Sequence, residues 1–84
     1  MKYTVILSRQ AEHFYKKLEE NDKTPVRENL INLQYQPRLG KHLHGDMKEN
    51  YSLRIGKLRL IYAVSEKDKT VYIIAIGTRK NIYH

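Results

Sequence analysis

From Tyr51 onward the apolar and polar residues alternate, and this period of two constrains the fold more than any other feature of the chain. The pattern predicts three strands, at about Tyr51–Ile55, Leu58–Val64 and Thr70–Ile76. Gly56 and Lys57 form the turn between the first two, with glycine in the first position, as a type II′ turn requires. The Ser65–Lys69 segment makes the second hairpin loop. In the last strand, both the odd-numbered and the even-numbered positions are apolar, which predicts a central strand covered on both faces.

The N-terminal part of the chain predicts a strand followed by a helix. Residues Lys2–Leu7 alternate and are rich in β-formers, so we expect the first strand there. Ser8 is a typical N-cap. The apolar stripe that follows has helical spacing and consists of Ala11, Phe14, Tyr15 and Leu18. The sequence therefore predicts a first helix that ends near Asn21.

A second helix is predicted from Thr24, a capping residue, and Pro25, which suits the first helical position. Its buried face consists of Val26, Leu30 and Leu33, with Ile31 beside them, and Pro37 ends it. Two helices joined by a few residues indicate an antiparallel helical hairpin. The predicted order is β-α-α-β-β-β, an α+β fold of one domain over residues 1–84, with the helical hairpin on one face of a small, mainly antiparallel sheet.

Charge narrows the classes of partner. The 84 residues include 16 Lys and Arg against nine Asp and Glu, which gives a net charge of +7. Such a field attracts nucleic acid or an acidic protein. The chain has no cysteine, which excludes disulfides and thiolate sites. The short strand-like start resembles neither a signal peptide nor a membrane span, so we expect a cytoplasmic protein without membrane contact.

Two arginines are predicted to face each other on the first hairpin. A two-residue turn sets the register, which pairs Ile55 with Leu58, Arg54 with Arg59, Leu53 with Leu60, and Tyr51 with Tyr62. The apolar pairs then share one face and the arginines lie on the other. Opposed like charges destabilise a sheet by a few tenths of a kcal/mol to ~1 kcal/mol. Either the guanidinium groups bind a phosphate, whose oxygens they match in pairs, or they splay into solvent.

The C-terminal segment adds candidates to the same face. Arg79 directly follows the last predicted strand, and Tyr83 lies four residues further on. Three arginines and a phenol therefore converge if the end of the chain forms a helical turn. The only metal-like spacing is His42-x-His44, and solvated or phosphate-facing histidines are the preferred interpretation. We expect no metal and no other cofactor.

The chain resembles the RelE/ParE superfamily of type II toxin–antitoxin toxins. The resemblance rests on RLGKHL at 38–43 with Gly45, on YSLRIGKLRLIYAV at 51–64 and on IAIGTRKNIY at 74–83. The order of elements agrees over essentially the whole chain. For a RelE-like member the resemblance implies a metal-independent endoribonuclease that cuts mRNA in the ribosomal A site. In that reaction the ribose 2′-hydroxyl attacks the adjacent phosphate, and the protein supplies alignment and charge neutralisation.

The resemblance also implies roles for individual residues. Arg54 and Arg59 correspond to the cations that stabilise the reacting phosphate, Arg79 to the arginine at the leaving oxygen, and Tyr83 to the tyrosine that orients the base. Ser52 stands where well-studied relatives have a lysine base, which would weaken the activity because a serine hydroxyl needs activation. The candidates for acid–base catalysis in its place are His42, His44, His84 and Glu49. The cations expected to contact RNA or the ribosome are Lys41, Lys48, Lys57 and Lys80.

The implied partners are a RelB-like antitoxin with an acidic segment, a 70S-type ribosome and mRNA. The free toxin is expected to be a monomer, and its complex with the antitoxin an oligomer. Two alternatives stay open. One is a ParE-like inhibitor of DNA gyrase that cuts no RNA, and the other is a basic module that binds nucleic acid without cleaving it.

Overall fold

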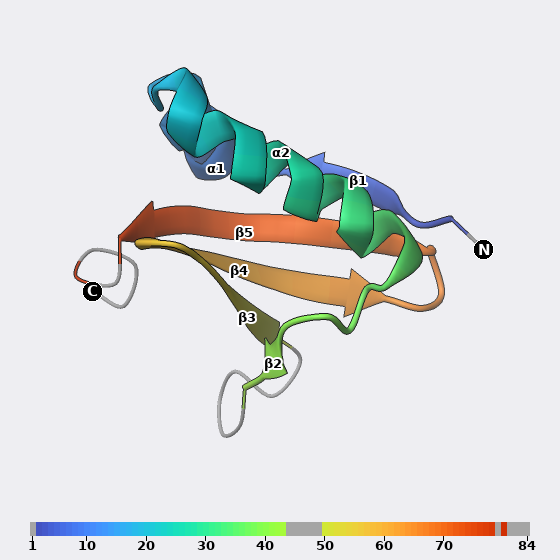
Figure 1. Ribbon diagram of the computed structural model, residues 1–84. Coiled ribbons are helices and arrows are strands. Elements are labelled where there is room, and N and C mark those ends of the chain that lie inside the picture. The colour runs from blue at the N-terminus through green and yellow to red at the C-terminus, as the bar shows by residue number, and fades with distance from the viewer. Residues whose placement is uncertain (1, 44–49, 79, 81–84) are drawn as a thin grey trace.

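The computed structural model describes residues 2–43, 50–78 and 80. Its elements are β1 (Thr4–Leu7), α1 (Arg9–Lys16), α2 (Glu20–Tyr35), β2 (Lys41–His42), β3 (Asn50–Ile55), β4 (Leu58–Ser65) and β5 (Thr70–Thr78). The strands form one sheet in the order β1-β5-β4-β3-β2. β1 runs parallel to β5, and every other neighbouring pair is antiparallel. Both helices lie on the same side of the sheet (Figure 1), which confirms the predicted fold class.

The register of the first hairpin is as predicted. Arg54 lies opposite Arg59, and the apolar pairs flank them. Gly56 has φ 60°, and Lys57 is not among the described residues with positive φ. A positive φ at the first turn position alone is what a type II′ turn requires. The turn residues therefore fix which side chains of β3 and β4 share a face.

The first helix is shorter than predicted. Its N-cap is Ser8, as expected, and the Ser8 hydroxyl accepts a hydrogen bond from the backbone N–H of Ala11 at 3.1 Å. The helix ends at Lys16, however, and not near Asn21. The backbone N–H of Leu18 donates to the carbonyl of Tyr15, which closes a tighter last turn. Leu18 still packs against the core from outside the helix.

The second helix begins earlier than predicted. It starts at Glu20, so Pro25 lies inside the helix and not at its first position. A proline in a helix interior costs about 3 kcal/mol, because it removes one backbone hydrogen bond and crowds the preceding turn. Two features offset this cost. Glu20 and Asp22 are acidic residues in the first turn, where the helix dipole favours them, and Val26, which follows the proline, is fully buried.

Strand β2 was not predicted. Its two residues pair with β3, Lys41 opposite Ser52 and His42 opposite Tyr51. A two-residue strand is too short to show a period in the sequence. It forms because the segment before it is anchored by Gly40, whose backbone N–H donates to the Tyr62 hydroxyl at 2.8 Å.

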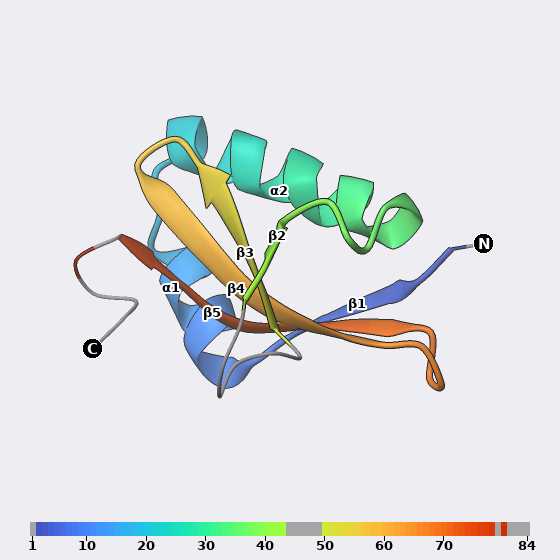
Figure 2. The ribbon, with the colours of Figure 1, turned by 90° about the horizontal axis from the view of Figure 1, so that it is seen from below.

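The prediction for the last strand is half right. β5 is central, between β1 and β4. The helices α1 and α2 cover only one of its faces, however, and Tyr72 and Ile74 are 39% and 41% exposed on the other. The residues between and after them, Ile73 and Ile76, are buried. The view from below shows no second layer of described residues on that side (Figure 2).

The core lies between the helices and the covered face of the sheet. Its largest fully buried side chains are Tyr62, Leu33, Leu60, Ile73, Ile76, Val26 and Val71. Among the described residues, no helix is long and apolar enough to cross a membrane.

Candidate active site

The arginine pair lies on the face of the sheet opposite α1 and α2, at the β3–β4 turn. Leu53, Leu60 and their apolar neighbours face the helices, and side chains alternate along a strand, so Arg54 and Arg59 point to the opposite side. Arg54 is exposed and Arg59 is half-buried. The Arg54 Nε donates to the carbonyl of Gly56 at 3.3 Å, which directs this guanidinium along the turn.

A small cavity of about 210 Å³ opens beside the pair. The described residues that line it are Arg54, Gly56, Lys57, Leu58 and Arg59, and none of these is acidic. Among the ion pairs between described residues, none includes either arginine, whereas Lys57 pairs with Asp22 at 3.7 Å. Two guanidinium groups that have no carboxylate partner among the described residues can together bind an anion, and phosphate matches their geometry.

The C-terminal end of β5 reaches the same place. Gly77 lies opposite Arg59, and Thr78 lies opposite Leu58. The chain therefore leaves the sheet beside the arginine pair. The predictions for Arg79, Tyr83 and His84 lie outside the described residues, as do those for His44, Lys48 and Glu49.

Strand β2 separates Lys41 from His42. Lys41 is paired with Ser52, and residues paired across strands share a face, so its side chain starts on the arginine side. His42 is paired with Tyr51 and shares the opposite face. The ring centroids of His42 and Tyr51 lie 4.9 Å apart, in keeping with that placement. The sheet thus brings Lys41 towards the arginines and directs His42 away from them. Lys57 is at the turn, and Lys80 is exposed.

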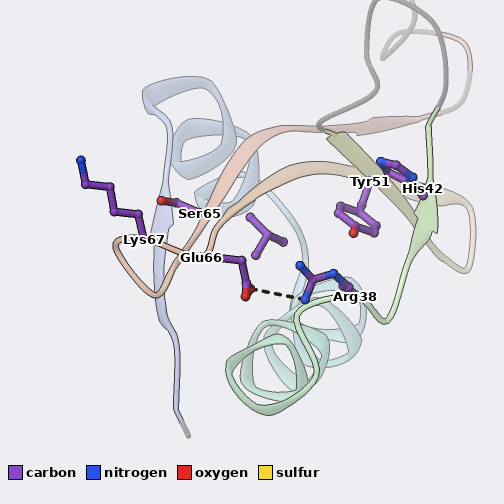
Figure 3. Close-up of a pocket in the computed structure, with 7 residues that line it drawn as sticks. Arg38, His42, Tyr51, Ser65, Glu66 and Lys67 are labelled. Atoms are coloured by element: carbon purple, nitrogen blue, oxygen red, sulfur yellow. Dashed lines mark ion pairs between the residues drawn. The ribbon is translucent and has the colours of Figure 1, made fainter.

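A second, larger cavity was not predicted from the sequence. It has a volume of about 740 Å³ and lies between the β4–β5 turn and the segment that joins α2 to β2 (Figure 3). The described residues that line it are Arg38, His42, Tyr51, Val64, Ser65, Glu66 and Lys67. These residues come from segments far apart in the sequence, so no local pattern indicates that they meet.

An ion pair organises the second cavity. Arg38 Nη1 lies 3.3 Å from Glu66 Oε1, and the Glu66 carboxylate raises the pKa of Arg38. The hydroxyl of Tyr3 donates to Glu66 Oε2 at 2.9 Å, and this bond is the main reason that the pKa of Glu66 is lowered. Lys69 Nζ lies 3.9 Å from the same carboxylate. Beside the cavity, burial raises the pKa of Tyr62.

Comparison with known proteins agrees with this architecture. The family model of ParE-like toxins of type II bacterial toxin–antitoxin systems matches residues 5–84. The chain belongs to this family. No curated protein sequence matches it.

Solved structures of toxins share the fold. The RelBE toxin–antitoxin complex from Mycobacterium tuberculosis contains a chain 30% identical to this one, with a TM-score of 0.83, over 94% of this chain and all (100%) of that one. The RelE–RelB complex of the archaeon Pyrococcus horikoshii matches at 26% identity and TM-score 0.78, over 96% and 99% of the two chains. A variant of E. coli RelE in the free state shares the fold at 22% identity and TM-score 0.80, over 99% and 90%.

Proposed function

We propose that this toxin is a ribosome-dependent endoribonuclease that cleaves mRNA in the A site and so inhibits translation. The observation that carries the proposal is the arginine pair: Arg54 and Arg59 face each other without a carboxylate partner among the described residues. A sheet with only a structural role gains nothing from opposed like charges. A site that holds a phosphate gains two cations in a fixed arrangement.

In the proposed reaction the ribose 2′-oxygen attacks the neighbouring phosphorus, and the bond from phosphorus to the 5′-oxygen breaks. The products are a 2′,3′-cyclic phosphate and a 5′-hydroxyl end. Arg54 and Arg59 neutralise the charge that builds on the phosphate oxygens. Arg79 assists the leaving 5′-oxygen, and Tyr83 orients the base. Thr78, immediately before Arg79, lies opposite Leu58, which supports these assignments because the last segment of the chain begins at the arginine pair.

The proton on the 2′-oxygen needs an acceptor. Ser52 is buried and lies between Lys41 on β2 and Ile61 on β4. Lys41 therefore adds a cation next to this serine, where we assign it a role in holding the RNA backbone. His84, His44 and Glu49 are the candidates for proton transfer. His42 is a weaker candidate, because the sheet directs it to the other face.

The proposed regulator is a RelB-like antitoxin with an acidic segment, for which the net charge of +7 is suited. The matching M. tuberculosis and P. horikoshii structures are complexes of toxin with antitoxin. The free toxin is proposed to be a monomer that acts in the cytoplasm on 70S-type ribosomes. Lys57, Lys48 and Lys80 supply further contacts to RNA.

Inhibition of DNA gyrase is the second candidate, because the matching family model describes ParE-like toxins. Induced expression in cells separates the two functions. We expect amino-acid incorporation to stop within minutes while plasmid supercoiling is unchanged. Arg54→Gln should restore growth, and so should Arg79→Ala. Arg27→Gln, which removes an exposed arginine from α2, should remain toxic. Loss of supercoiling with continued translation would indicate the gyrase function instead.

A further inference from the structure

Apart from His42, the weaker candidate for proton transfer, the residues that line the second cavity have no part in the reaction proposed above. We propose that it binds one nucleotide of single-stranded RNA, with the base against the rings of His42 and Tyr51 and the phosphate on Arg38. This inference rests on the proposed function only in that a toxin acting at the ribosome meets such RNA. It adds a second RNA contact, on the other side of the sheet from Arg54.

The aromatic wall of the cavity is built across three strands. The rings of Tyr62 and Tyr51 are stacked, with centroids 5.3 Å apart and planes at 12°. The His42 ring continues the row on β2, 4.9 Å from Tyr51 and tilted by 33°. Tyr62 is fully buried on the neighbouring strand β4, so its ring holds the stacked ring of Tyr51 in position. Unstacked RNA bases bind to such flat, pre-positioned rings with little dependence on sequence.

The cationic side of the cavity is equally fixed. Arg38 is held by Glu66, yet its side chain is 56% exposed, so part of the guanidinium faces the opening (Figure 3). Glu66 also interacts with Lys69 and accepts from Tyr3, so its single negative charge is shared. Lys67 adds a further positive charge to the lining. The surplus of cations over carboxylates favours a phosphate as the ligand.

Size and polarity distinguish a nucleotide from a simple anion. The volume of about 740 Å³ lies within the range of small-molecule sites, roughly 300–1,000 Å³. Val64 and the rings give the cavity apolar walls, and Arg38 places a donor at its edge. A nucleotide combines a flat base with a phosphate and fills both kinds of surface. A peptide carboxylate would use the guanidinium, but the same peptide would need an additional aromatic or apolar side chain to pack against the rings.

Binding to an uncleavable RNA tests the inference without any assay of cleavage. The probe is a fluorescent, 2′-O-methylated hexaribonucleotide, followed by anisotropy over a range of salt concentrations. Arg38→Gln should weaken binding at least fivefold, and it should reduce the slope of log K against log salt by about 0.7, the value for one phosphate contact on a single strand. The matched control is Arg27→Gln, because Arg27 is also an exposed arginine near a glutamate, at 3.9 Å. It should change affinity by less than about twofold.

Two further measurements keep the result independent of folding. In the wild-type protein, the oligonucleotide should shift the amide NMR signals of His42 and Tyr51. His42→Ala should weaken binding, whereas His13→Ala, an exposed histidine of α1, should not. Equal affinities of Arg38→Gln and Arg27→Gln, no shift at Tyr51, or no RNA binding at all would overturn the inference. So would a glutamate-rich peptide that binds through Arg38 while RNA does not.

A second binding experiment distinguishes ribosomal RNA from messenger RNA as the ligand of the cavity. It measures binding of the protein to small ribosomal subunits that carry no message. Weaker binding of Arg38→Gln to these subunits would place ribosomal RNA in the cavity. A loss confined to the oligonucleotide would place the messenger strand there. Either result supports the inference even if the protein cleaves nothing. Conversely, Arg38-independent RNA binding by an active nuclease would overturn the inference and leave the proposed function intact.

Discussion

Arg54 and Arg59 face each other directly across the β3–β4 hairpin, on the side of the sheet opposite α1 and α2. We expect their repulsion to weaken the fold, so the proposed function and stability oppose each other at this pair. We expect Arg54→Gln to raise the free energy of unfolding by about 0.5 kcal/mol, which corresponds to a Tm about 2–4 °C higher. The gain should shrink in high salt, which screens exposed charges. Thermal denaturation at two salt concentrations checks this prediction, and a variant less stable than the wild type would contradict it.

The Tyr62 hydroxyl should matter for stability because it holds the segment before β2. It accepts the backbone N–H of Gly40 at 2.8 Å, and a Cβ on Gly40 would approach the Ser52 carbonyl to 2.7 Å. Tyr62→Phe leaves this N–H without its partner, at a cost of about 1–3 kcal/mol. Urea denaturation measures the loss. Tyr72→Phe, at an exposed position on β5, is the control and should stay within about 0.5 kcal/mol of the wild type.

Acid should destabilise the protein partly through Glu66. Its pKa is lowered in the folded state, first by the hydrogen bond from Tyr3 and also by Arg38 and Lys69. A lowered pKa means that Glu66 stabilises the fold above its unfolded pKa, near 4.5, and that this contribution is lost as the pH falls through the folded value. Glu66→Gln should therefore lower the Tm at pH 7 more than at pH 3. Tyr3→Phe should likewise lower the Tm at pH 7 more than at pH 3. If the pH dependence of the Tm were unchanged in both variants, Glu66 would have no part in acid destabilisation.

The last three residues are predicted to serve activity more than folding. Deletion of Ile82–His84 removes Tyr83 and His84, to which the proposed reaction assigns base orientation and proton transfer. We expect growth arrest to be lost while the Tm changes by only a few degrees. Comparing toxicity with the melting curve of the truncated protein checks this. Full toxicity after truncation would show that the segment takes no part in the reaction.

Patterns of short range predicted most of the fold. The period of two and the Gly56 turn were sufficient for the β3–β4 register, and hence for the arginine pair, because turn chemistry fixes register locally. The helix boundaries failed where tertiary packing outweighs local propensity. Pro25 resembles a helix start, but burial of Val26 and Leu33 stabilises a helix that continues through it.

The rest of the surface depends on contacts between distant segments. β2 exists because Gly40 meets Tyr62, 22 positions away. The second cavity likewise needs Glu66 to meet Arg38. Neither contact produces a periodic pattern in the sequence, so neither β2 nor the second cavity could be predicted from it. The prediction that both faces of β5 are covered was wrong for a related reason. Apolar composition alone cannot tell which face of a strand the helices cover.

The most direct test of the central claim is translation in vitro with purified, antitoxin-free protein, followed by primer extension on the message. A matched message carries a single 2′-deoxynucleotide at the cleaved position. We predict cuts at A-site codons that require ribosomes, that disappear at the deoxy position, and that are lost in Arg54→Gln but kept in Arg27→Gln. An intact message in the presence of active ribosomes, or cleavage that persists without the 2′-hydroxyl, would contradict the proposed reaction.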